Sequence, residues 1–355
     1  MLEVDLGAIV ENWRALCTRH SSGPCAGVVK ADAYGLGAAM VAPALLAAGC
    51  RHFFVATLDE ALSIRDRLPG GMLAVLGGLL PGTEAIYRDR DVVPVLGSLS
   101  EIDAWTATAR AAGRELPAIL HVDTGMARLG LAANELAVLQ GDHARLAGLE
   151  LRYVMTHLVA SEIEDDPLNP VQRDRFAAAC AGLPSAPRSF ANSSGIFLGP
   201  GWASDLARPG AALYGINPVP GRPNPMRSVA RLLVRVLAVR ELPAGTPVGY
   251  NATWQAARPS RIATGGIGYA DGLHRSISDR TCAFFDGSPV PLVGRVSMDL
   301  TTFDVTDHPA IVPGTWLELL GPNQSPDDLA VMAGTNGYEV LTSLARRLRR
   351  EYLPA

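Results

Sequence analysis

Short apolar segments alternate with helical patterns through the first two thirds of the chain. Eight segments are short and apolar enough for buried strands, and stretches with helical periodicity separate them. They are residues 26–29, Phe53–Ala56, Leu73–Leu76, Val92–Leu96, Ala118–Val122, Leu151–Thr156, Arg188–Ala191 and Leu206–Ala207. Such alternation is typical of a parallel sheet with helical connections, and eight units in about 210 residues predict a (β/α)8 TIM-type barrel. An open, doubly wound sheet is the alternative, but its GxGxxG turn is not matched by Gly35 and Gly37.

The pattern changes after Gly215, where Asn217–Pro225 is a proline-rich connector. Beyond it, β-branched segments between Gly, Pro and Asp turns predict a mostly β C-terminal domain. These segments are 227–240, 246–250, 261–267, 281–285, 289–293, 300–305 and 315–320. Helical periodicity predicts helices over 2–20, Ala38–Ala48, Asp327–Ala333 and Tyr338–Arg350. We therefore expect a barrel domain over 1–218, whose first ~10 residues could join the β domain, and a β domain over 219–355.

Composition excludes several classes of function. The 355 residues carry a formal net charge of −4, so no basic surface recommends nucleic acid or an anionic membrane. The five cysteines are scattered and form no CxxC pair, which indicates neither a metal site nor a disulfide framework. No apolar run is long enough for a transmembrane helix, and the first residues do not resemble a signal peptide. We expect a cytoplasmic protein.

Polar residues follow the predicted barrel strands, at the end where active sites of this fold lie. Lys30 comes directly after the first strand, within VVKADAYGLG. A desolvated lysine amine loses its proton readily and can form a Schiff base, although a lysine at a strand tip can also simply face solvent. The later strands are followed by Asp123 and Arg128, His157, Asn192 and Ser193, and Arg208, Gly210 and Ala211.

The segment VVKADAYGLG resembles the cofactor-lysine signature of the alanine racemase family, and the resemblance covers nearly the whole chain. Further matching segments are DTGMARLG, ANSSG, ARPGAALYG, GYNATW, GGIGYADG, VGRVSMD and GYEVLTSL. The resemblance implies a pyridoxal 5'-phosphate enzyme that interconverts L- and D-alanine for peptidoglycan precursors and forms a homodimer with shared active sites. The alternatives are a broader racemase acting on serine or basic amino acids, and a non-catalytic pyridoxal phosphate-binding protein.

The same resemblance assigns roles to individual residues. Racemisation removes a proton from one face of Cα and returns it on the other, which requires two bases. The resemblance implies that Lys30 is one base and also holds the cofactor, and that Tyr250 is the second. It assigns cofactor binding to Tyr34, His157, Asn192, Ser193, Arg208, Gly210 and Ala211, and substrate binding to Arg128, Met298, Tyr269 and Asp299. Arg208 would face the pyridine nitrogen, and Tyr269, Asp271 and Arg275 would form a narrow entrance.

Three positions depart from the family pattern. His121 stands where many members have a carboxylated lysine that orients the arginine matched by Arg128, so a bound anion or another network must take that role. Leu36 replaces the histidine of YGHG, and Ser297 replaces the cysteine of VGRVCMD. For the tyrosine that usually contacts the phosphate from the C-terminal region, the chain offers Tyr352.

Overall fold

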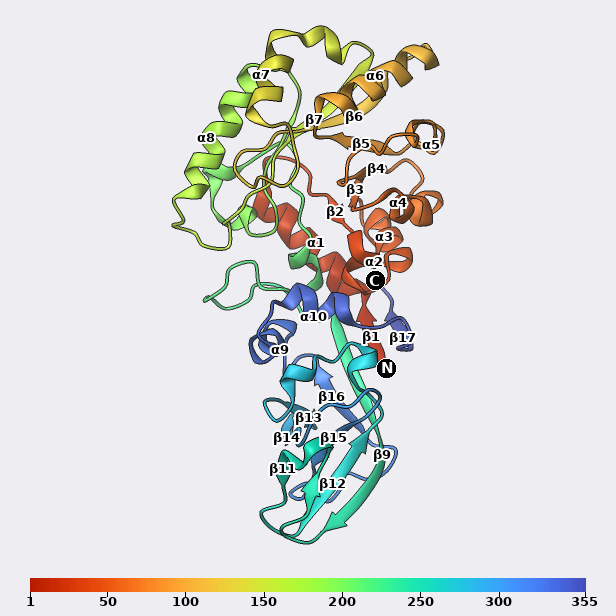
Figure 1. The fold of residues 1–355 in the computed structure, drawn as a ribbon, viewed down its shortest axis with the longest axis vertical. Coiled ribbons are helices and arrows are strands. Elements are labelled where there is room, and N and C mark those ends of the chain that lie inside the picture. Colours follow the sequence, from red (N-terminus) through yellow and green to blue (C-terminus); the bar gives the residue numbers. More distant parts are fainter.

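The computed structural model describes residues 1–355 and has two parts that follow one another along its longest axis (Figure 1). One part contains a parallel sheet surrounded by helices, and the other is built mainly from antiparallel strands. The N- and C-termini both lie between the two parts (Figure 1). None of the helices has the length and apolar composition needed to cross a lipid bilayer.

A parallel sheet with seven strands in sequential order forms the barrel. Its strands are β2 (Gly27–Val28), β3 (His52–Val55), β4 (Met72–Val75), β5 (Val93–Leu96), β6 (Leu116–His121), β7 (Leu149–Met155) and β8 (Arg188–Ser189). The eighth predicted segment closes the barrel through two parallel bridges, in which Leu206 pairs with Ser189 and Ala207 pairs with Cys25. The (β/α)8 prediction is therefore confirmed, with a last strand reduced to two residues.

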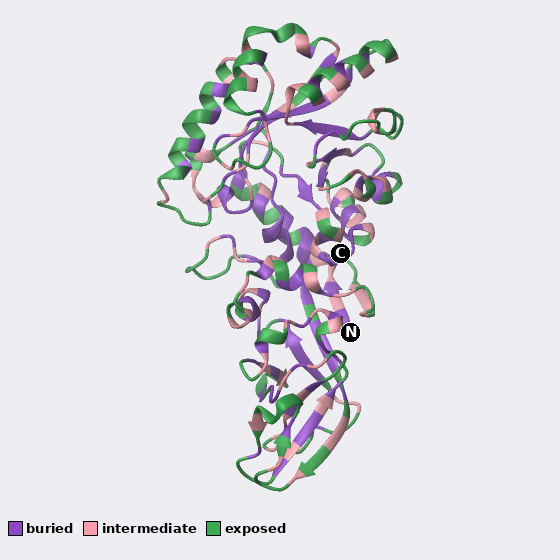
Figure 2. Cartoon of the chain, viewed as in Figure 1, coloured by how far each residue is buried: buried purple, intermediate pink, exposed green.

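Helices follow most of these strands and cover the outside of the barrel. They are α1 (Leu6–His20), α2 (Lys30–Tyr34), α3 (Ala38–Ala47), α4 (Leu58–Ile64), α5 (Glu84–Asp89), α6 (Leu99–Ala112), α7 (Ala133–Gly141) and α8 (Leu168–Ala181). Buried residues concentrate on the sheet and on the helix faces turned toward it (Figure 2). Nine buried side chains, among them Phe54, Val95 and Ile119, form a separate cluster that is contributed mainly by the barrel strands. The barrel is thus a packed core.

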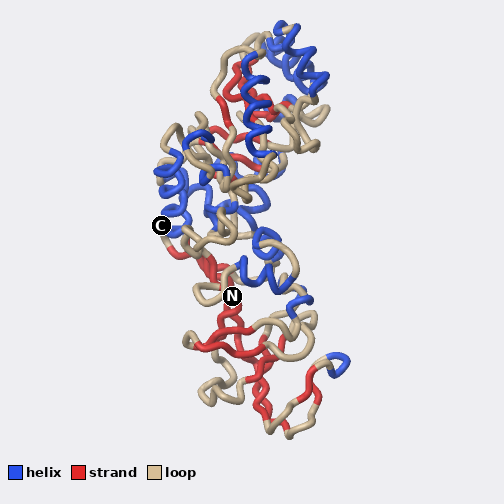
Figure 3. The backbone as a smooth tube through the Cα atoms, turned by 90° about the vertical axis from the view of Figure 1, so that its left-hand side faces the viewer, coloured by secondary structure: helices blue, strands red, loops and turns tan.

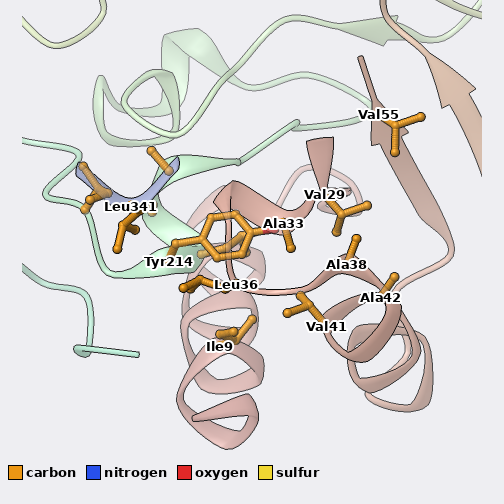
Figure 4. Close-up of a cluster of buried hydrophobic side chains, with 14 of the residues drawn as sticks. Ile9, Val29, Ala33, Leu36, Ala38, Val41, Ala42, Val55, Tyr214 and Leu341 are labelled. Carbon is orange, nitrogen blue, oxygen red and sulfur yellow. The ribbon is translucent and has the colours of Figure 1, made fainter. Parts of the chain in front are cut away.

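Leu36, one of the departures from the family pattern, has a packing role. It is fully buried in the cluster drawn in Figure 4, together with Ile9 of α1, Tyr214 and Leu341. Burying a leucine side chain contributes about 1.5–3 kcal/mol to stability. The leucine therefore helps to join the first helix to the C-terminal region of the chain.

The second part is an eight-stranded sheet with the order β14-β13-β16-β9-β1-β17, in which β12 pairs with both β9 and β15. Its strands are β1 (Leu2–Asp5), β9 (Ala230–Leu242), β12 (Ser260–Gly265), β13 (Cys282–Phe285), β14 (Ser288–Pro291), β15 (Thr301–Asp304), β16 (Trp316–Leu320) and β17 (Arg350–Leu353). The helices α9 (Pro326–Ala333) and α10 (Gly337–Ser343) lie between this sheet and the barrel (Figure 1). A separate hairpin, β10 (Pro247–Val248) with β11 (Trp254–Gln255), projects from this part of the molecule (Figure 3).

Two helix predictions were wrong at their ends. Residues 2–5 form β1, which pairs with β9 and β17, and α1 begins only at Leu6 because the Asp5 carboxylate caps it by accepting the Ala8 N–H at 2.8 Å. The helix predicted over Tyr338–Arg350 ends at Ser343, and Arg350 begins β17. In both cases pairing with a strand distant in sequence overrides the local periodicity.

Candidate active site

A cavity of about 400 Å³ opens at the C-terminal ends of the barrel strands. It brings together the polar residues that follow β2, β7 and β8 and the short eighth strand. All eight residues proposed for cofactor binding line it, namely Lys30, Tyr34, His157, Asn192, Ser193, Arg208, Gly210 and Ala211. The alternation of strands and helices thus delivers these dispersed residues to a single place.

Lys30 stands at the start of a left-handed turn. Ala31, Asp32, Ala33 and Tyr34 all have φ between 53° and 55°, so α2 does not have the usual right-handed geometry. This conformation costs about 1–2 kcal/mol for each non-glycine residue, and its neighbours must therefore hold it in place.

Lys30 is also the only lysine of the chain. Burial, and then the nearby Arg128 guanidinium, lower the pKa of the Lys30 amine, while the Glu60 carboxylate acts in the opposite direction. A lowered pKa increases the share of neutral amine, which is the form that attacks an aldehyde. This side chain is therefore suited to Schiff-base chemistry.

A small cup of hydroxyl groups and backbone N–H groups lies at one end of the cavity. The Ser193 hydroxyl accepts the N–H groups of Gly210 at 3.0 Å and of Ala212 at 3.2 Å. A Cβ atom at Gly210 would collide with the Tyr34 hydroxyl, whose ring stacks on Tyr214 with centroids 4.7 Å apart. Close backbone approach of this kind, with N–H groups and hydroxyls converging, fits a phosphate group.

Arg208 is buried and has hydrogen-bond acceptors instead of a carboxylate partner. It donates to the Ser189 hydroxyl at 2.6 Å and to the Thr156 carbonyl at 2.5 Å. Burial lowers the pKa of its guanidinium to about 10, so the group stays charged at neutral pH. A buried cation of this kind fits an unprotonated ring nitrogen, which can accept a hydrogen bond from it.

Two histidines near Arg208 are held neutral. Burial and then the charge of Arg208 lower the pKa of His157 to about 3 and that of His121 to about 4. His121 therefore cannot supply the negative charge of a carboxylated lysine. The Asp123 carboxylate accepts the N–H groups of its own turn at residues 125–127, at 2.9–3.2 Å. Arg128 thus receives no carboxylate from this turn.

The site carries an excess of positive charge. No ion pair links Lys30, Arg128 or Arg208 to a carboxylate, since the ion pairs of the protein lie elsewhere. Lys30 and Arg208 line the cavity and Arg128 lies near Lys30, and unpaired cations in such a place favour anionic ligands. A phosphorylated cofactor together with a substrate carboxylate would supply such charges.

The C-terminal helix α10 contributes two further residues to the cavity, which sequence reasoning missed. Tyr338 and Thr342 line it, and the Tyr338 hydroxyl donates to the Glu162 carboxylate at 2.6 Å. Both residues belong to the segment GYEVLTSL, and its resemblance to the family was the sequence feature that could have identified them. Tyr352, the tyrosine suggested from the sequence, instead packs against Gly37 and does not line the cavity.

The remaining candidate residues do not line the cavity. Arg128 follows β6 in the barrel and lies near enough to Lys30 to lower the pKa of its amine. The others lie on the β part of the molecule. Tyr250, Tyr269 and Met298 are 66%, 44% and 54% exposed. Tyr269 donates its N–H to the Ser297 carbonyl at 2.9 Å, which brings Tyr269 close to Met298. All three residues are therefore exposed, and none lines the Lys30 cavity of its own chain.

Asp271 of the proposed entrance and Asp299, a proposed substrate-binding residue, share one cation. Arg347 binds both Asp271 and Asp299, with a shortest distance of 2.7 Å to each. Arg275 opens a short 3₁₀ helix over 275–277 on the same part of the chain. Asp271 is buried and closes the 3₁₀ helix Tyr269–Asp271, so it lies on the same part of the molecule as Tyr269.

A closed α/β barrel with a lysine of lowered pKa, a cup of hydroxyl and backbone N–H groups and a buried arginine defines a class: barrel enzymes that hold a phosphorylated aldehyde cofactor on a lysine. Comparison with known proteins agrees. Residues 4–218 match the family model for the alanine racemase N-terminal domain, and residues 229–352 match that for the alanine racemase C-terminal domain. The chain belongs to the alanine racemase family.

Individual relatives are similar over their full lengths. The chain is 57% identical to an alanine racemase of Acidiphilium cryptum over 98% of this chain and 97% of the relative. It is 52% identical to an alanine racemase of Rhodospirillum rubrum, covering 99% and 95% of the two chains. The crystal structure of alanine racemase from Bartonella henselae with covalently bound pyridoxal phosphate superposes with a TM-score of 0.96 at 40% identity, covering 99% of both chains.

Proposed function

We propose that this protein is an alanine racemase that interconverts L- and D-alanine with pyridoxal 5'-phosphate held on Lys30. The observation that carries the proposal is the single cavity in which the only lysine, the phosphate cup and the buried Arg208 meet. Family membership supports alanine as the substrate. Supply of D-alanine to peptidoglycan stays a prediction from the family resemblance.

The cofactor, when bound, withdraws electrons from Cα of the attached amino acid and so makes the Cα proton acidic. In our proposal the Lys30 amine takes or returns that proton on one face, and the Tyr250 hydroxyl serves the opposite face. Arg128 and the backbone at Met298 would bind the substrate carboxylate. Asn192 is held for its role by accepting the Ser161 hydroxyl at 2.9 Å and the Gly195 N–H at 2.8 Å.

Arg208 would control the electronics of the cofactor. Its guanidinium keeps its charge at neutral pH and has no acid beside it to relay a proton. It would therefore donate a hydrogen bond to the ring nitrogen and leave that nitrogen unprotonated. A weaker electron sink restricts proton return to Cα, which favours racemisation over transamination. His157, neutral beside it, would pack against or hydrogen-bond the ring system and its arginine.

We also propose that the active form is a homodimer with shared sites. Tyr250 is two-thirds exposed on the projecting hairpin and does not line the cavity of its own chain. A two-fold arrangement in which each β domain covers the partner's barrel would bring Tyr250 to the partner's cavity. In this assignment the barrel domain (1–218) binds the cofactor, and the β domain (219–355) supplies the second base and the entrance.

The first test uses the fact that the chain has one lysine. We expect purified protein with pyridoxal phosphate to absorb visible light and to racemise alanine, and borohydride to fix the cofactor on the peptide that contains Lys30. Lys30→Ala should abolish the absorbance, the adduct and the activity together. The N-terminal amine, which is retained in the variant, is the internal control. An adduct that persists in Lys30→Ala, or an inert wild-type protein with a bound cofactor, would contradict the proposal.

Substrate range is tested in the same assay. A panel of L-amino acids that includes serine, lysine and arginine is followed by loss of optical rotation. We expect alanine to react fastest, because the proposed entrance group of Tyr269, Asp271 and Arg275 would exclude long side chains. Equal rates for basic amino acids would favour the broader racemase instead.

A further inference from the structure

The barrel contains the same carboxylate contact three times. Glu60, Glu101 and Glu135 each occupy the third position of a barrel helix, on α4, α6 and α7. In each case one carboxylate oxygen accepts an N–H from the loop before its own helix. The other oxygen accepts an N–H from the neighbouring βα unit, in the segment that follows the barrel strand one earlier in the chain. The carboxylate thus ties neighbouring βα units together at the C-terminal end of the barrel.

Two of these contacts, those of Glu101 and Glu135, bind backbone that lies outside the cofactor cavity. Glu101 accepts the Gly97 N–H at 2.5 Å and the Leu79 N–H at 3.3 Å. Glu135 accepts the Leu99 N–H at 3.1 Å and the Ala132 N–H at 3.4 Å. None of these six residues lines the cofactor cavity. Their contacts therefore serve as internal references for the purely structural effect of such a clamp.

The contact made by Glu60 differs from the other two because it binds the backbone next to Lys30. Glu60 accepts the Ala56 N–H at 2.8 Å and, with its other oxygen, the Ala31 N–H at 2.6 Å. Ala31 is the first residue of the left-handed turn and the residue directly after Lys30. Because the acceptor is an ionised carboxylate, the hydrogen bond is charge-assisted and roughly twice as strong as one between neutral groups.

The far end of the same turn is fixed by a second carboxylate. Asp32 accepts the Ala38 N–H at 2.8 Å, and Tyr34 stacks on Tyr214 beside the phosphate cup. The turn therefore carries Lys30 at one end and Tyr34 at the other, with both residues lining the cavity. Because four non-glycine residues in a row have positive φ, the turn needs outside contacts to persist.

We propose that Glu60 is a positioning residue: by accepting the Ala31 N–H, its carboxylate holds the left-handed turn that presents Lys30 to the cofactor. The inference rests on the proposed function, in which Lys30 carries the cofactor. Glu60 also places a negative charge near an amine that otherwise faces the cation Arg128 and the neutral His157. Thr57 supports the arrangement, since its hydroxyl accepts the Glu60 N–H at 3.3 Å.

The experiment compares Glu60→Ala and Glu60→Gln with Glu135→Ala as the matched control. The dissociation constant of pyridoxal phosphate and the rate at which the lysine-bound absorbance appears are measured for each protein. Hydrogen exchange of the peptide around Ala31 is measured without cofactor, and melting temperatures report stability. Glu60→Ala should weaken cofactor binding by about tenfold or more, which is the usual effect of losing a hydrogen bond to a charged group. The Ala31 peptide should exchange faster.

Two comparisons decide the result. Glu60→Gln should recover part of the affinity, because its amide oxygen can still accept the Ala31 N–H. Glu135→Ala should lower the melting temperature but leave cofactor affinity and the Ala31 peptide unchanged. Equal cofactor affinity in Glu60→Ala and Glu135→Ala would overturn the positioning role. If Glu60→Ala does not fold, Glu60→Gln decides the result. The positioning role would be overturned if the Ala31 peptide of Glu60→Gln exchanges hydrogen fast while its cofactor affinity and its rate of forming the lysine-bound absorbance stay at the wild-type values. A wild-type protein without an adduct on Lys30 would instead overturn the proposed function.

Discussion

At the scale of single residues, burial sets the charge state of the site. Arg208 keeps its proton because its pKa falls only to about 10, whereas His121 and His157 lose theirs because burial and Arg208 lower their pKa to about 4 and about 3. The same surroundings lower the pKa of all three side chains, but only the histidines, whose ordinary pKa is already about 6.5, become neutral at neutral pH. His121 replaces the family's charged lysine with a neutral ring, and Arg128 must be oriented in another way.

This charge state predicts how stability depends on pH. The pKa of His121 is about 4 when folded and close to 6.5 when unfolded. Below pH 6.5 the unfolded chain therefore takes up a proton that the folded protein does not. The free energy of unfolding should then fall by about 1.4 kcal/mol per pH unit for this group between pH 6.5 and 4, with no such loss above pH 6.5.

Urea unfolding of the cofactor-free protein between pH 4 and 8 measures this effect. The quantity that matters is the difference between the wild type and His121→Asn, because other groups titrate equally in both. The variant should lose less stability than the wild type as the pH falls from 6.5 to 4. Parallel curves for the two proteins would show that folding does not lower the pKa of His121.

At the scale of elements, the site is assembled from loops whose backbones approach one another closely. The segment at Gly210 accommodates the Tyr34 hydroxyl only because it has no Cβ, and the left-handed turn carries that tyrosine into place. The two loops follow the first and last strands of the barrel, which are joined by the Cys25–Ala207 bridge. The pairing that closes the barrel therefore also places the two loops of the phosphate cup side by side.

Gly210→Ala should consequently damage the cup. The added methyl group collides with the Tyr34 hydroxyl, and overpacking of this kind costs about 1–3 kcal/mol of stability. We expect a lower melting temperature and weaker binding of pyridoxal phosphate, and partial recovery of both when Tyr34→Phe is added. Gly141→Ala, at the end of α7 with nothing near the new methyl group, is the control and should not lower the melting temperature. Gly210→Ala with wild-type cofactor affinity would contradict this account of the cup.

At the scale of the whole molecule, the chain separates its two proposed bases. Lys30 lines the barrel cavity, and Tyr250 is exposed between β10 and β11. These two strands form the hairpin that projects from the β part (Figure 3). A single chain therefore does not complete the two-base site. The proposed dimer would do so twice, with identical composite sites.

Mixing two inactive variants tests the shared site. In a heterodimer of Lys30→Ala and Tyr250→Phe chains, one site carries both changes and the other carries neither. Random pairing makes half of the dimers mixed, so about a quarter of the wild-type activity should return after subunit exchange. Each variant alone, taken through the same exchange procedure, is the control. If exchange is verified and no activity returns, Tyr250 serves its own chain and the shared site is rejected.

Local patterns in the chain were enough to predict much of the barrel and its cavity. Buried strands, helix ends and the residues after each strand depend on nearby side chains, so the parallel sheet could be placed from periodicity alone. Lys30 and Arg208 could be assigned to one rim because parallel strands end on the same side of a barrel. The eight cofactor candidates accordingly line one cavity.

Pairing between distant segments decided the rest. Residues 2–5 and 350–353 form strands because they pair with one another in parallel. The local sequence pattern of either segment does not predict this pairing. Tyr338 reached the cavity, and Tyr352 did not, through the placement of α10 against the barrel. Three of the four residues in the left-handed turn after Lys30, namely Ala31, Ala33 and Tyr34, have no local preference for positive φ, and contacts from Glu60 and Asp32 hold the turn. Such features are stabilised by contacts between segments far apart in the chain. These contacts exist only in the tertiary structure, so local sequence patterns do not predict them.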